Sequence, residues 1–128
     1  MKILAIDLGE TTGYALVKHY ISGVPLRPFA LLSHGTCRLG GMMPDYGPDL
    51  VVIERPAYIG AGAKIQEEYS DAVSYYRRVF SNIKVVVVKP ADWMPRFNHY
   101  PLPGRGMLPT QHEKDAYRMA AWAHEKFA

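Results

Sequence analysis

The chain has 128 residues, of which 48% are apolar and 21% charged, so it can form one domain with a hydrophobic core and is too apolar for a disordered segment. Lysine and arginine exceed aspartate and glutamate by 15 − 12 = +3, all of it after residue 50, which permits a polyanionic partner without indicating one. The single cysteine, Cys37, excludes an internal disulfide and a zinc site built from cysteines.

No stretch of the sequence approaches the roughly 20 apolar residues that cross a bilayer. The first residues lack the apolar core and cleavage site of a signal peptide. We therefore expect a soluble protein of the cytoplasm, with no membrane partner.

Short apolar runs predict buried strands in the first half of the chain. The predicted strands cover residues 2–8, 12–18, 28–36 and 50–53. The first contains Asp7 near its end, and the last is followed by Glu54. Residues 38–49 are rich in glycine and proline, so they are predicted to form a loop with at most one helical turn.

The hydrophobic period changes near residue 63, where apolar side chains begin to recur at helical spacing. The elements predicted from there on are a helix over 63–80, a strand over 84–88, a short helix from Pro90, a long mobile loop over 95–109 and a last helix from residue 110. In that last helix Thr110 and Glu113 form a capping-box pattern. The order predicts one α/β domain, residues 1–128, with helices covering a sheet.

Asp7 and Glu54 each stand at the carboxyl end of a predicted buried strand. If those strands are parallel neighbours, both carboxylates emerge at the edge where open α/β sheets bind ligands. Two carboxylates held together share a proton or hold a cation, and oxygen ligands beside a polyanionic substrate favour Mg²⁺ or Mn²⁺. The alternative is that each carboxylate only caps its strand; the matched strand ends favour the metal site.

His112 and Asp115 lie three residues apart at the start of the last helix, on the side of Ala116 and Met119. Both should therefore point toward the same sheet edge. Taken alone, they are explained more simply as a solvated histidine and an acid placed favourably near a helix N-terminus. Together with the two strand-end carboxylates, they make four potential ligands converging on one place.

Three segments resemble motifs of the RuvC-type Holliday junction resolvases. ILAIDLGETTGYA at residues 3–15 is similar to the family's opening apolar strand, Asp-x-Gly and following turn. DLVVIE at 49–54 is similar to its second acidic strand, and HEKDA at 112–116 to its closing motif. The three occur in the family's order and span nearly the whole chain.

The resemblance implies an RNase H-like fold, a mixed five-stranded sheet flanked by helices. Its usual helix between strands 3 and 4 is predicted to be short or missing here, because residues 38–49 are few and rich in glycine and proline. The compact chain suits a phage-type member, which would act in the cytoplasm of its host.

The resemblance also implies a homodimer that resolves four-way DNA junctions by paired, symmetric hydrolysis of phosphodiesters, with a metal-activated water. Asp7, Glu54, His112 and Asp115 would hold two Mg²⁺ or Mn²⁺ ions and, with Lys114, form the catalytic site. No nucleotide cofactor is implied. Because imidazole is a softer ligand than carboxylate, His112 predicts that Mn²⁺ supports activity at least as well as Mg²⁺.

DNA binding requires positive charge around this acidic site. With three site carboxylates set aside, basic residues exceed acidic ones by 15 − 9 = +6. The candidate DNA-binding residues are Arg55, Tyr58, Lys64, Arg77, Arg78, Lys89, Arg96 and Arg105. Tyr58 stands beside the position of the family's aromatic wedge, and Arg96 and Arg105 lie in the predicted mobile loop. For about half of these residues, plain solvation is the simpler explanation.

Three other interpretations remain open. A related RNase H-like nuclease would act on flaps, forks or other branched DNA. The segment 7–13 also looks like the phosphate-binding strand of actin-like kinases and ATPases, but those proteins need two such domains. A non-catalytic DNA-binding module is the third, and the four intact ligand positions argue against it. Trp93 and Trp122 are explained better as core residues than as stacking platforms.

Overall fold

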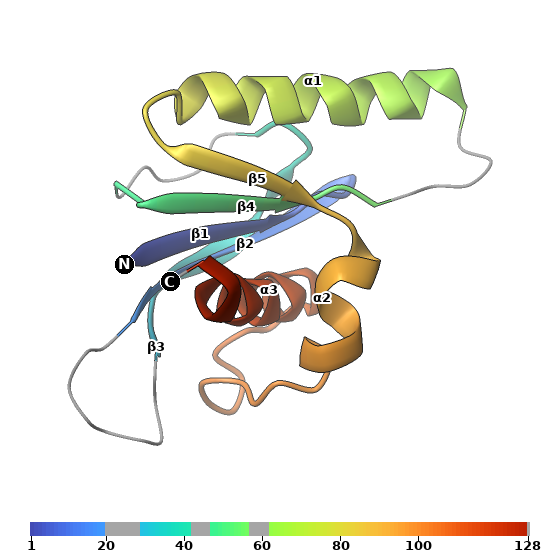
Figure 1. Cartoon of the computed structure of the whole chain (residues 1–128). Helices are drawn as coiled ribbons and strands as arrows, with labels where there is room; N and C mark the ends of the chain where they lie inside the picture. The colour runs from blue at the N-terminus through green and yellow to red at the C-terminus, as the bar shows by residue number, and fades with distance from the viewer. Residues whose placement is uncertain (20–28, 42–46, 57–61, 128) are drawn as a thin grey trace.

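The computed structural model describes residues 1–19, 29–41, 47–56 and 62–127, which form five strands and three helices (Figure 1). The elements are β1 (Lys2–Asp7), β2 (Thr11–His19), β3 (Phe29–Arg38), β4 (Leu50–Glu54), α1 (Ala63–Val79), β5 (Lys84–Val88), α2 (Pro90–Phe97) and α3 (Gln111–Phe127). The strands make one sheet in the order β3-β2-β1-β4-β5. Each of these elements was predicted from the sequence.

The sheet is mixed, as predicted. β1 runs parallel to β4, and β4 runs parallel to β5. β2 pairs antiparallel with both β1 and β3. β1 and β4 lie at the centre, which explains their continuous apolar sequences: strands covered on both faces have no solvent side for polar residues.

Helices cover both faces of the sheet. α1 lies on one face, and α2 and α3 lie on the other (Figure 1). Tyr69, Ala72 and Tyr76 of α1 pack against one set of strand side chains, and Tyr75 is only partly buried. On the other face, Trp93 of α2 and Trp122 of α3 are both buried, so their predicted place in the core is confirmed.

Small side chains bring α3 close to the sheet. Ala5 of β1 and Ala15 of β2 are register partners on the α3 face, and both are fully buried. α3 presents Ala116 and Ala120 in the same cluster. A helix and a sheet that meet through alanines can approach more closely than ones that meet through larger side chains, which sets how near the start of α3 comes to the strand ends.

Helix α2 is longer than the sequence predicted. The predicted loop over 95–109 begins only after Phe97, and Pro95 lies inside the helix. Trp93 and Phe97, one helical turn apart, are both buried, and their burial offsets the backbone hydrogen bond that Pro95 cannot make. Between β3 and β4, residues 39–41 and 47–49 contain no helix; residues 42–46 lie outside the described part of the chain.

Among the described residues, none of the helices combines the length and the apolar character that crossing a bilayer requires.

Candidate active site

Asp7 and Glu54 are direct register partners at the carboxyl ends of the parallel strands β1 and β4. Side chains alternate along a strand, and Ile3 and Ala5 pack on the α3 face, so Asp7 belongs to that face too. Leu50 and Val52 place Glu54 there by the same argument. The two carboxylates therefore emerge at one edge and on one face, as the sequence predicted.

Burial makes this pair electrostatically costly when both carboxylates are charged. Asp7 is 6% exposed and Glu54 is 5% exposed. Desolvation is the main cause that raises the pKa of Glu54 to about 7, although the Trp93 hydrogen bond acts the other way; the negative charges of Asp7 and Asp115 raise it further. Desolvation also raises the pKa of Asp7, against the lowering effect of its hydrogen bond with His112. A bound cation would relieve this repulsion.

His112 contacts Asp7 directly. Its Nδ1–H donates a 3.0 Å hydrogen bond to Oδ2 of Asp7, while the imidazole stays 45% exposed. The contact depends on Gly13, the register partner of Asp7 in β2. A Cβ at position 13 would lie 2.5 Å from the carbonyl carbon of His112, so only glycine allows the first turn of α3 to come so near.

Glu54 has a partner that sequence reasoning missed. The indole Nε1–H of Trp93, in the first turn of α2, donates a hydrogen bond to Oε2 of Glu54. The signal that could have found it is position: α2 follows β5, whose last residue, Val88, is the register partner of Glu54. A tryptophan one turn into that helix therefore starts close to the carboxylate.

Asp115 and Lys114 are less closely tied to the carboxylate pair. Oδ1 of Asp115 accepts a 2.9 Å hydrogen bond from the side chain of Gln111. The charge of Asp115 nevertheless raises the pKa of both Asp7 and Glu54. Lys114 is partly buried, and its backbone N–H donates to the carbonyl of Thr110.

The donor set fits a divalent cation only in part. Within the described residues, no three side chains of histidine, cysteine, aspartate or glutamate gather closely enough to hold one ion. What the fold brings together is the buried pair Asp7 and Glu54, with His112 bonded to Asp7. Carboxylate oxygens are the donors that Mg²⁺ and Mn²⁺ prefer, and a bound cation would offset the repulsion that helps to raise the pKa of Glu54. The four-ligand set with Asp115 stays a prediction.

A second network, also missed, fixes the start of α3. Glu113 is 3% exposed, and its Oε2 lies 2.5 Å from Nδ1 of His34 in β3. The Thr110 hydroxyl accepts from the Glu113 backbone N–H, which is the first half of the predicted capping box, and it donates to Oε1 of Glu113. The cap by Thr110 was predicted, but the burial of Glu113 and its bond to His34 were not. This network joins β3 to the turn that carries His112.

The candidate DNA-binding residues lie in different surroundings. Lys89 is exposed and directly follows Val88, the register partner of Glu54, so it stands at the candidate edge. Arg55 is partly buried and donates to the side chain and backbone carbonyl of Gln66. The other exposed candidates in the described chain are Lys64, Arg77, Arg78, Arg96 and Arg105. Tyr58 lies outside the described residues.

The prediction that Arg96 lies in a mobile loop is wrong. Arg96 lies in α2, where it donates a 2.8 Å hydrogen bond to Glu125 of α3. The pair exists because α2 continues to Phe97 and lies alongside α3, so the arginine emerges next to the last turns of that helix.

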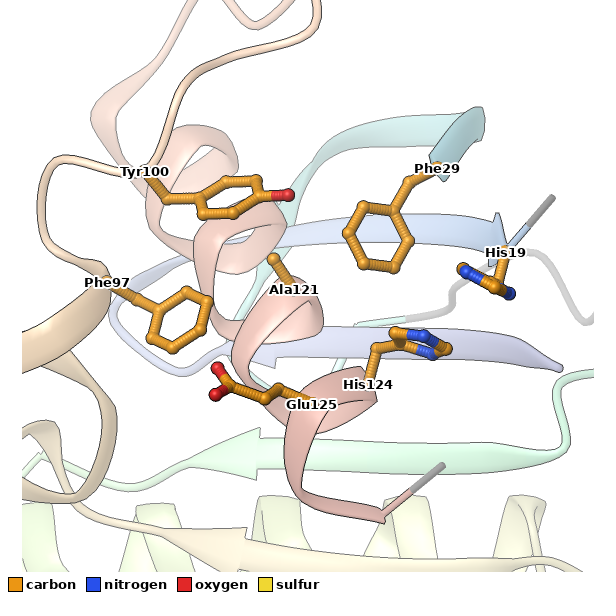
Figure 2. A pocket seen from close by; sticks show the side chains of 7 residues that line it. All are labelled: His19, Phe29, Phe97, Tyr100, Ala121, His124 and Glu125. Atoms are coloured by element: carbon orange, nitrogen blue, oxygen red, sulfur yellow. The ribbon is translucent and has the colours of Figure 1, made fainter. Parts of the chain in front are cut away.

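A hollow of about 670 Å³ lies at the opposite end of α3 (Figure 2). The imidazoles of His19 and His124 stack there with ring centroids 4.0 Å apart, and Phe29 stands edge-on to both. His19 ends β2, whereas Gly13, opposite Asp7, lies near its start. This hollow is therefore separate from the candidate active site.

Comparison with known proteins adds evidence at the level of the fold. No protein-family model matches the chain, and no curated protein matches its sequence. Solved structures do match. The RuvC structure of Thermus thermophilus is similar with a TM-score of 0.66 and 16% identity, over 98% of this chain and 96% of that one.

Two further structures have similar coverage. T. thermophilus RuvC in complex with a Holliday junction substrate matches with a TM-score of 0.69 and 15% identity, over 99% of this chain and 97% of that one. The fowlpox virus Holliday junction resolvase matches with a TM-score of 0.52 and 15% identity, over the same shares. The chain therefore has the RNase H-like fold of the RuvC-type Holliday junction resolvases.

Proposed function

We propose that this protein is a metal-dependent endonuclease that resolves four-way DNA junctions by paired, symmetric hydrolysis. The observation that carries the proposal is the buried, in-register pair Asp7 and Glu54 at the carboxyl edge of the sheet. The likeness to junction resolvases over nearly the whole chain supports the choice of substrate. In the described part of the chain, no basic side chain except His112 is bonded to either carboxylate, so the buried pair is suited to a cation and unsuited to binding phosphate directly.

Each site residue has a role in this proposal. Asp7 and Glu54 hold the divalent ions, with His112 and Asp115 completing the ligand set from α3. When bound, Mg²⁺ or Mn²⁺ would supply a Lewis acid that activates water and stabilises the leaving oxygen. His112 must give up its bond to Asp7 to ligate through Nδ1. Lys114, between the two α3 ligands, would place positive charge beside the scissile phosphate.

The DNA partner would be held by basic residues around the acidic edge. Lys89 has the best place among them, because it is exposed and adjoins the strand end next to Glu54. Lys64, Arg77 and Arg78 of α1 offer further exposed positive charge for phosphate contacts. Paired cuts at a symmetric junction require two active sites, so we include a two-fold homodimer in the proposal.

The test compares a labelled immobile four-way junction with a linear duplex of the same sequence, in Mg²⁺, Mn²⁺ or EDTA. We expect paired, symmetric nicks in the junction alone, abolished by EDTA and by Asp7→Asn while binding to the junction persists. Asp49→Asn is the matched control. Asp49 is exposed at the opposite end of the same strands, where it accepts a 2.8 Å hydrogen bond from the Lys2 backbone. This variant should cut like the wild type.

Other results would change the proposal. Equal cutting of flaps and forks would indicate a nuclease of broader branched-DNA specificity. Junction binding without cutting in either metal would indicate a DNA-binding module. If the protein neither binds nor cuts the junction, a nucleic-acid function is refuted altogether.

A further inference from the structure

Glu54 and Trp93 form a buried pair from two different elements. Trp93 is 1% exposed, and its Nε1–H donates to Oε2 of Glu54. An indole N–H can only donate, and when buried it needs an acceptor. The carboxylate supplies that acceptor, so the bond satisfies a buried donor and engages one of the two Glu54 oxygens.

The start of α2 fixes the indole in this place. Lys89 precedes the helix, and its backbone N–H donates a 2.8 Å hydrogen bond to Oδ2 of Asp92. The Asp92 N–H in turn donates to the Lys89 carbonyl at 3.0 Å. The ring of Trp93 packs in the core cluster shared with α3. These bonds fix the backbone of the first turn of α2, and burial of the ring in the core resists its movement away from Glu54.

Asp7 is the acidic neighbour of Glu54 at this edge of the sheet. The two residues are register partners at the ends of parallel strands, and both side chains belong to the α3 face of the sheet. The bond from Trp93 engages Oε2 of Glu54, which leaves Oε1 for the site that Glu54 shares with Asp7.

We propose that Trp93 is a positioning residue that holds Glu54 in one orientation and leaves its Oε1 atom for a divalent ion shared with Asp7. This inference rests on the proposed function, because it concerns the same metal site. Partners that orient a ligating carboxylate commonly change metal affinity by about 10- to 100-fold when removed.

The first test compares Trp93→Phe with Trp122→Phe. Both variants shorten a buried tryptophan of the same core cluster, but the Trp122 ring contacts Phe127 and Lys126 and not the carboxylate pair. Mn²⁺ binding is measured by electron paramagnetic resonance of the free ion, without DNA. Junction cutting is measured over a full Mn²⁺ titration. We expect Trp93→Phe to raise the Kd for Mn²⁺ about tenfold or more. The cutting midpoint should rise in parallel, and Trp122→Phe should leave both unchanged.

A second variant separates the hydrogen bond from packing. Replacing Trp93 by 3-benzothienylalanine exchanges the N–H for sulfur and keeps the shape of the ring. The proposal requires this variant to lose Mn²⁺ affinity like Trp93→Phe while its circular dichroism stays that of the wild type. Wild-type Mn²⁺ affinity in the benzothienyl variant would overturn the proposal.

The outcomes distinguish this inference from the proposed function. If the wild type binds Mn²⁺ but cuts no DNA, the proposed function fails and the Kd comparison still decides the role of Trp93. If the wild type cuts junctions and Trp93→Phe has the same Mn²⁺ dependence, only the positioning role fails. If the wild type binds no Mn²⁺ and cuts no junction in Mg²⁺ or Mn²⁺, both are refuted; if it binds no Mn²⁺ but still cuts, only the positioning role fails.

Discussion

Gly13 of β2 lies directly against the backbone of His112 at the start of α3. A Cβ on Gly13 would stand 2.5 Å from both the carbonyl carbon and the Cβ of His112, distances that real Cβ atoms essentially never show. Because Gly13 is also the register partner of Asp7, the missing side chain decides where His112 meets the carboxylate pair. Gly13, in the motif at residues 3–15, thus leaves the space that the backbone of His112, in the motif at 112–116, occupies.

Gly13→Ala should push the first turn of α3 away from the sheet. We expect a loss of about 1–3 kcal/mol in the free energy of unfolding, as in other overpacked cores, measured by urea denaturation. Junction cutting should fall by about tenfold or more, because a small displacement of a ligand is costly in an active site. Gly35→Ala is the control, since the three atoms nearest its Cβ, at 2.8 to 3.2 Å, belong to the side chain of Tyr14 and not to the backbone. Equal effects of the two substitutions would contradict the claim that the missing Cβ of Gly13 sets the position of His112.

Glu54 should make the metal-free protein less stable as the pH rises. Its pKa is raised by burial from 4.5 to about 7, so in this range the folded state keeps a proton that the unfolded state releases. The stabilisation is complete below pH 4.5 and is lost as the pH rises through about 7. We expect a contribution of about 1–2 kcal/mol, less than the full shift corresponds to, because some solvent reaches the carboxyl.

The measurement is urea unfolding in EDTA from pH 4.5 to 8, for the wild type and Glu54→Gln. The difference in stability between the two proteins should shift in favour of Glu54→Gln as the pH rises. Adding Mn²⁺ at pH 8 should recover stability in the wild type and much less in the variant. A difference that stays constant with pH would refute the raised pKa.

His124 should have the opposite effect at the other end of α3. Burial, followed by the positive charges of His19 and the N-terminus, lowers the pKa of His124 below its ordinary 6.5. The imidazole is therefore kept neutral in the folded state, and its contribution is complete above pH 6.5 and lost as the pH falls below that value. Glu125 is the acidic residue that also lines this hollow (Figure 2).

Comparing His124→Gln with the wild type by urea unfolding between pH 5 and 7.5 tests this. We expect the wild type to lose stability relative to the variant as the pH falls. A wild type that gains relative stability in acid would mean that the charged imidazole is favoured in the fold.

Local pattern was enough to predict part of the site and not the rest. Asp7 and Glu54 end continuous apolar runs, and they come together because parallel neighbouring strands in this register end at the same edge of the sheet. Trp93 and Glu113 could not be assigned this way, because their hydrogen bonds join residues 39 and 79 positions apart. Which distant side chain meets them depends on how α2 and α3 pack on the sheet, and in the case of Glu113 that partner is His34.

Mn²⁺ should support junction cutting at least as well as Mg²⁺. His112 lies beside Asp7, and imidazole nitrogen binds Mn²⁺ more readily than Mg²⁺. Initial rates over full titrations of both ions would measure the preference. His112→Asp should shift it toward Mg²⁺ by replacing the nitrogen with oxygen. Faster cutting in Mg²⁺ by the wild type would exclude His112 as a ligand that matters for the choice of ion.

Glu113→Gln should loosen the start of α3 from β3. The buried carboxylate accepts from His34 and Thr110, and an amide in its place turns one acceptor oxygen into an NH₂ group facing those donors. We expect a loss of about 1–3 kcal/mol in unfolding free energy, measured by urea denaturation.

Glu125→Gln is the matched control on the same helix. Its partner Arg96 is 72% exposed and Glu125 itself 51%, so this ion pair should contribute less than about 1 kcal/mol. Since His112 adjoins Glu113, the first substitution should also weaken Mn²⁺ binding, and the control should not. Equal stability of the two variants would mean that the His34–Glu113 contact does not fix the turn that carries His112.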